Sequence, residues 1–97
     1  MPTYITLMRL TEQGIKNIKD APQRIQEGIT ALEKSGGTII GFYSVMGEYD
    51  YVIIAEGTSD EAVAVFNLAL GSQGNVRTTT LRAFPKDQFI KMVKGMP

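Results

Sequence analysis

The alternation of apolar and polar residues along this chain changes period several times, and each change predicts a new element. Residues 4–10 (YITLMRL) are rich in strand formers and predict a first strand. Apolar residues then recur at helical spacing from Ile25 to Leu32. A capping-box pattern makes Asp20 the expected N-cap of this helix, and residues 35–37 (SGG) end it.

The second half of the chain repeats the change from strand to helix. Gly47 and Glu48 separate two strand-like segments that are close enough to form a hairpin. The expected elements are a strand over 38–46, a strand from Tyr49 or Asp50 to Glu56, a helix capped within 58–60 and reaching Leu70, a strand over 77–84, and a short helix from Pro85.

The order β-α-β-β-α-β predicts one ferredoxin-like α+β domain over residues 1–97, with a four-stranded antiparallel sheet and both long helices on one face. The third strand offers two apolar sets, one of Val52 and Ile54 and the other of Tyr51, Ile53 and Ala55. Because helices cover only one face, the other face needs a second layer. The sheet of a second copy is the simplest candidate, as in a dimeric α/β barrel. If Ile53 faces outward, Ile53→Lys should dissociate the oligomer.

Composition excludes several classes of function. The chain has no Cys and no His, which removes the usual zinc sites, haem attachment, thiol nucleophiles and a Ser-His-Asp triad. We therefore expect no metal and no cofactor. Ten basic residues balance ten acidic ones, so the net positive field of a nucleic-acid binder is absent. No apolar stretch is long enough to cross a membrane, and the first residues do not have the pattern of a signal peptide, so we expect a cytoplasmic protein.

Residues 47–50 (GEYD) resemble the signature for which the GYD domain family is named. Further landmarks follow the same pattern: Thr11 with Gly14, Pro22 with Arg24, and residues 74–78 (GNVRT). The resemblance runs from about Tyr4 to Phe84. It implies membership of the dimeric α/β-barrel superfamily, which includes cofactor-free monooxygenases, haem enzymes and ligand-binding domains. The haem-binding members use a His on the iron, which this chain does not have.

In the expected topology the family landmarks meet at one rim of the sheet. The first two strands end there and the last two begin there, close to the start of the first long helix. A small polar or anionic ligand is the expected occupant. The predicted ligand-binding residues are Thr11, Gly14, Arg24, Tyr49, Asp50 and Arg77. The competing structural interpretation makes Asp50 an acceptor for the N–H groups of residues 11–14 and the ion-pair partner of Arg24.

Two functions follow from these observations. The first is a homodimer or higher homo-oligomer, associated through the sheet face, that binds a small ligand or acts by assembly. The alternative is a cofactor-free, monooxygenase-like enzyme in which Asp50 is the base, the only catalytic candidate. A carboxylate of Asp50 facing a ligand-sized cavity would favour the enzyme, and a carboxylate engaged by backbone N–H groups would favour the assembly.

Overall fold

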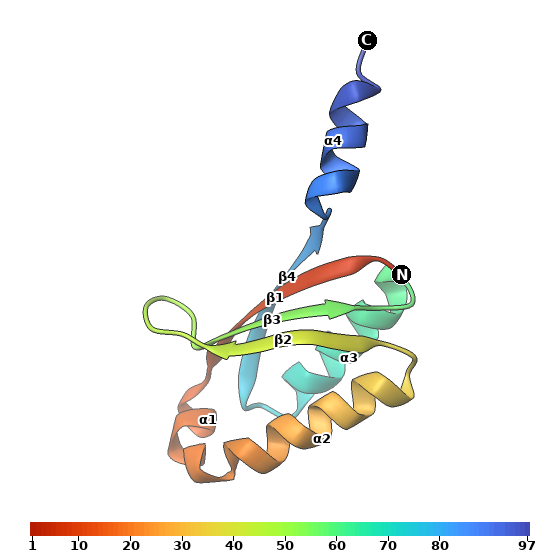
Figure 1. Cartoon of the computed structure of the whole chain (residues 1–97). Coiled ribbons are helices and arrows are strands. Elements are labelled where there is room, and N and C mark those ends of the chain that lie inside the picture. The colour runs from red at the N-terminus through yellow and green to blue at the C-terminus, as the bar shows by residue number, and fades with distance from the viewer.

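The computed structural model describes all residues, 1–97, and has the predicted ferredoxin-like arrangement. Its four strands form one antiparallel sheet in the order β2-β3-β1-β4 (Figure 1). The elements are β1 (Thr3–Leu10), α1 (Glu12–Lys16), the 3₁₀ turn η1 (Ile18–Asp20), α2 (Ala21–Lys34), β2 (Thr38–Ser44), β3 (Tyr51–Glu56), α3 (Asp60–Ser72), β4 (Val76–Ala83) and α4 (Lys86–Lys94).

The two long helices begin in different ways. At α3 the expected cap forms, because the Ser59 hydroxyl accepts a hydrogen bond from the Ala62 N–H at 3.1 Å. At α2 the expected cap is wrong. Asp20 occupies the N-cap position, but its side chain caps no N–H group. The 3₁₀ turn η1 leads directly into this helix and gives Asp20 a helical backbone, whereas an N-cap side chain needs an extended one.

Four of the nine buried residues lie on the helix-covered face of the sheet. Tyr4 and Thr6 of β1 and Tyr51 and Ile53 of β3 are all at most 9% exposed. Helix α2 packs over β2, and α3 packs over β4. Ile53 is therefore in the core, with 6% of its surface exposed, and it is not an outward-facing residue. Its substitution would disrupt folding, so it does not report on association.

The opposite face of the sheet is apolar and has no cover. Neighbouring strands pair Ile5 with Ile54 and with Leu81, and Leu7 with Val52, so these five side chains form one continuous patch. We call these five residues the open face. Leu81 keeps 47% of its surface exposed. The structure thus confirms that both faces of the sheet are apolar while the long helices cover only one.

Helix α4 is separate from the rest of the molecule. It follows β4 after the short link of Phe84 and Pro85, and it extends past the end of the sheet, away from α1 and α2 (Figure 1). This extension contributes to the elongated shape of the chain, 52 × 31 × 19 Å. None of the helices combines the length and the hydropathy that crossing a bilayer requires.

Candidate functional site

The predicted rim is present, because the strand ends meet as the topology requires. The Asp50 N–H donates to the Met8 carbonyl at 2.8 Å, which joins the start of β3 to the end of β1. On the other side of β1, the Thr11 N–H donates to the Asn75 carbonyl at 3.0 Å, next to the start of β4. The family landmarks therefore lie close in space although they are scattered in sequence.

The carboxylate of Asp50 is engaged by the backbone. Its Oδ2 atom accepts a hydrogen bond from the Leu10 N–H at 2.8 Å, and its own carbonyl accepts from the Val45 N–H at 2.9 Å. The acceptor role predicted for Asp50 is thus correct in kind, but the donor is Leu10 and not an N–H of residues 11–14. The arrangement fastens the hairpin loop to the end of β1.

The expected ion pair between Asp50 and Arg24 is absent. The Arg24 guanidinium donates to the Asn17 carbonyl at 2.9 Å, at the end of α1. The reason is that successive residues of a strand point to opposite faces of the sheet. Met8 pairs with Tyr51, so Asp50 lies opposite Arg9 on the open-face side, whereas α2 and Arg24 lie on the other side of the sheet. Alternation along a strand therefore separates the two charges.

The signature loop is held by its own side chains. Gly47 has φ of 110°, a backbone conformation that favours glycine, and a Cβ there would meet no atom within 4 Å. The Arg9 guanidinium lies 4.9 Å from the centre of the Tyr49 ring and forms an ion pair with Glu48. The neighbouring Tyr49 phenol is the largest cause that raises the pKa of Arg9 above its ordinary value, and the Glu48 carboxylate adds to it.

Thr11 and Gly14 join the first loop to the start of β4. The Thr11 hydroxyl accepts from the Gly14 N–H at 3.1 Å and donates to the Gly74 carbonyl at 2.5 Å. Gly14 is buried, and a Cβ at this position would lie 2.2 Å from the Asn75 carbonyl oxygen. Glycine is required here by the close approach of two backbones, whereas at Gly47 it is required by the backbone angle.

The six predicted ligand-binding residues do not line a common pocket. Asp50 and Arg9 share the open-face side, and Arg77 pairs with Arg9 across the strands and is exposed. Arg24 lines a cavity on the helix side, and the polar groups of Thr11 are used within the loop. Ligand binding by this set stays a prediction, and the geometry divides the set between two faces.

The cavity on the helix side lies between the sheet and the two long helices. Its volume is about 90 Å³, and its lining is mostly apolar, with Phe42, Tyr51 and Phe66 among the contributors. Pockets for drug-sized ligands usually measure roughly 300–1,000 Å³. Asp50 does not line this cavity. The condition that would have favoured the monooxygenase alternative is therefore not met. No group of three or more acidic side chains lies close enough together to hold a metal ion.

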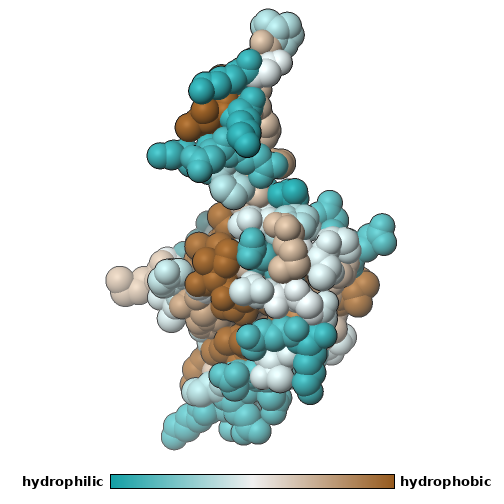
Figure 2. All heavy atoms as spheres, turned by 45° about the vertical axis from the view of Figure 1, so that its right-hand side comes forward, coloured by the Kyte–Doolittle hydropathy of each residue, from teal (hydrophilic) through white to brown (hydrophobic).

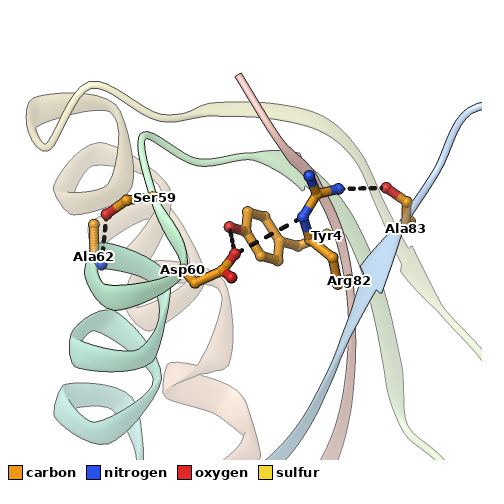
Figure 3. Close-up of polar contacts among 6 residues, drawn as sticks. All are labelled: Tyr4, Ser59, Asp60, Ala62, Arg82 and Ala83. Atoms are coloured by element: carbon orange, nitrogen blue, oxygen red, sulfur yellow. Dashed lines mark hydrogen bonds and ion pairs between the residues drawn. The ribbon is translucent and has the colours of Figure 1, made fainter. Parts of the chain in front are cut away.

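A second polar cluster, which the sequence did not predict, lies at the other end of the sheet (Figure 3). The Tyr4 hydroxyl donates to the Asp60 carboxylate at the start of α3. The Arg82 guanidinium approaches the same carboxylate at 3.8 Å and lies over the Tyr4 ring at 5.6 Å. Burial, followed by the contact with Asp60, raises the pKa of Tyr4 above its ordinary value. Tyr4 is 4% exposed, and its hydrogen bond to Asp60 ties α3 to the sheet.

Large apolar side chains are exposed at several places on the surface. Figure 2 shows hydrophobic side chains gathered in patches on the body and along one side of α4 above it. Eight of the exposed large apolar residues fall in three groups: the open face with Leu81 and the neighbouring Tyr43, the outer side of α3 with Val65 and Leu68, and α4 with Phe89, Ile90, Met92 and Val93. Large exposed apolar patches often mark sites where other molecules bind.

Comparison with known proteins agrees with the landmarks in the sequence. Residues 4–93 match the model of the GYD domain family. The chain is also 38% identical over 95 residues to the glutamine synthetase and cystathionine beta-lyase binding protein of Thermus thermophilus, a similarity that spans 97% of this chain and all of that protein. No solved structure was found to match the chain significantly.

Proposed function

Since the chain belongs to the GYD domain family, and the relative that it resembles over its full length is named for binding two enzymes, we propose that it is a protein-binding module. It associates with itself through the open face and binds a metabolic enzyme as its partner. We expect it to act in the cytoplasm, in the company of such enzymes. The exposed apolar surface is the observation that carries this proposal.

Self-association is supported by the composition of the open face. Ile5, Leu7, Val52, Ile54 and Leu81 lie side by side on a sheet whose long helices cover the other face. A second copy has the same patch, so a two-fold symmetric dimer would bury the open faces of both copies against each other. Burying apolar area removes it from water at roughly 25 cal/mol per Å², which makes this contact favourable for a chain with few buried residues.

An enzyme partner is supported by the relative and by the small volume of the cavity. The relative is named as binding glutamine synthetase and cystathionine beta-lyase. The helix-side cavity of about 90 Å³ has little room for a ligand of ordinary size, which favours a protein over a small molecule as the partner. A role as a regulator of enzymes also requires no catalytic set in this chain.

Binding of the two enzymes by the immobilised chain tests the proposal. Purified glutamine synthetase and cystathionine beta-lyase from the same organism would be titrated over the chain in biolayer interferometry. We expect saturable binding of at least one enzyme in the micromolar range or tighter. A metabolic enzyme of unrelated fold serves as the control. If neither enzyme binds at concentrations of tens of micromolar, the proposed enzyme partners are wrong.

A further inference from the structure

Helix α4 has an apolar stripe that its own chain does not cover. Phe89, Met92 and Val93 follow the spacing i, i+3, i+4, which places them on one side of the helix, and Met96 follows just after its C-cap Gly95. Their exposed fractions are 56%, 48%, 47% and 68%. Lys91, Lys94 and Asp87 fall on the opposite side. The helix is therefore built to pack against an apolar surface.

The body of the same chain does not provide that surface. Helix α4 points away from α1 and α2, past the end of the sheet (Figure 1). It has nine residues, and isolated helices shorter than about 12–15 residues are marginal in water. Packing against another molecule would supply the missing stabilisation.

Helix α3 has a matching surface on its outer side. Its inner side packs on the sheet through Phe66 and Leu70, but Val65 and Leu68 on the outside are 66% and 73% exposed. A helix that is apolar on all sides is usually buried on all sides. Helix α2 differs, because its outer side is polar, with hydrogen-bonded pairs Gln23–Glu27 and Gln26–Thr30. Of the two long helices, α3 is the one that lacks a cover.

The charges of the two helices are complementary. Lys86 lies on the side of the stripe in α4, whereas Glu61 lies on the outer side of α3 with Val65. Over their whole length, α4 has three lysines and one aspartate, and α3 has two acidic residues and no basic one. At 13 residues, α3 is also long enough to lie along the whole of α4. Opposite net charge favours this pairing over a contact between two α4 helices, in which like charges meet.

We propose that α4 is an exchanged arm, which packs its apolar stripe on the outer side of α3 in a second copy of this chain. The proposal rests on the self-association proposed above and adds to it a contact outside the open face. One such contact covers two exposed apolar surfaces, and its reciprocal formation gives a closed two-fold dimer. Val93 of one copy and Leu68 of the other lie near the centre of the contact.

Site-specific crosslinking tests the arm directly, because the chain has no Cys of its own. A chain carrying Leu68→Cys is co-expressed with a chain carrying Val93→Cys and is treated with a short bismaleimide. We expect a covalent heterodimer, identified by its mass on a denaturing gel and in the mass spectrometer. The control pairs Val93→Cys with Thr30→Cys, which is exposed on the outer side of α2. We expect that pair to give little product.

The outcomes separate the arm from self-association in general. No heterodimer, equal yields for the Leu68 and Thr30 pairs, or a homodimer of Val93→Cys alone would overturn the arm. A Leu68→Cys, Val93→Cys double variant that crosslinks within one chain would also overturn it. If light scattering of the untreated protein still gives a dimer in these cases, the proposed self-association stands. In support of the arm, Phe89→Glu should raise the dimer dissociation constant about tenfold or more, and no change would count against it.

Discussion

Replacing Asp50 by Asn and by Ala separates the structural role of this carboxylate from a catalytic one. The structure gives the side chain one bond, from the Leu10 N–H at 2.8 Å. A hydrogen bond to a charged group contributes about 1.5–3 kcal/mol, and a neutral one about 0.5–1.5 kcal/mol. Since Asn keeps a neutral acceptor, Asp50→Asn should cost about 1 kcal/mol. Asp50→Ala leaves the Leu10 N–H without its partner and should cost about 2 kcal/mol.

For a domain of this size, 1 kcal/mol lowers the melting temperature by about 4–8 °C. Thermal unfolding followed by circular dichroism should therefore show a loss of about 4–8 °C for Asn and about 8–16 °C for Ala. Glu48→Ala is the matched control, because this carboxylate belongs to the same loop but is exposed and pairs only with the exposed Arg9. We expect its effect to stay below about 1 kcal/mol.

The same measurement tests the separation of Asp50 from Arg24. The two side chains share no hydrogen-bond partner, since Arg24 donates to Asn17. The free energies lost in Asp50→Ala and Arg24→Ala should therefore add in the double variant to within about 0.5 kcal/mol. A coupling above about 1 kcal/mol would show that the charges interact. Full stability of both Asp50 variants would refute the structural role and favour a functional one.

Three further predictions follow from the structure. Gly14→Ala should lower the free energy of unfolding by about 2 kcal/mol or more in urea, because its Cβ would lie 2.2 Å from the Asn75 carbonyl oxygen and one of the two backbones would have to move; unchanged stability would contradict the contact. Ile54→Lys should dissociate the oligomer in size-exclusion chromatography while Thr30→Lys leaves it intact, and a folded Ile54→Lys oligomer would contradict the open-face contact. The pKa of Tyr4 is raised in the folded state. The neutral phenol therefore contributes its full stabilisation below about pH 10, and this stabilisation is lost as the pH rises through the pKa that Tyr4 has in the folded protein. Between about pH 9 and pH 11, the Tyr4→Phe variant should therefore lose less unfolding free energy than the unsubstituted protein. Equal losses in the two proteins would show that Tyr4 is not the source of this pH dependence.

The order of elements was predictable because its signals are local. Strand and helix periods, the Ser59 cap and the helix start at Pro85 each depend on a few neighbouring residues, and each appears in the structure. The rim of the sheet was also predictable, since it follows from the topology. The resemblance of residues 47–50 to the GYD signature correctly gave the family.

Pairing between distant residues was not predictable. Both sets of β3 residues are apolar, so the sequence did not show that Ile53 faces the helices and Ile54 faces away. The topology brings the start of α2 and the start of β3 to one rim, which predicts an ion pair of Arg24 with Asp50. Alternation along the strand instead places the two side chains on opposite sides of the sheet. The contact of Tyr4 with Asp60 joins residues 56 positions apart, and no local sequence pattern predicts it.

Light scattering coupled to size-exclusion chromatography tests the central claim, that this chain is a protein-binding module that associates with itself. One chain has a mass of 10.6 kDa. At micromolar concentrations the open face predicts a peak with the mass of two chains or a larger whole-number multiple. A single peak of 10.6 kDa, unchanged as the protein is concentrated, would contradict the account.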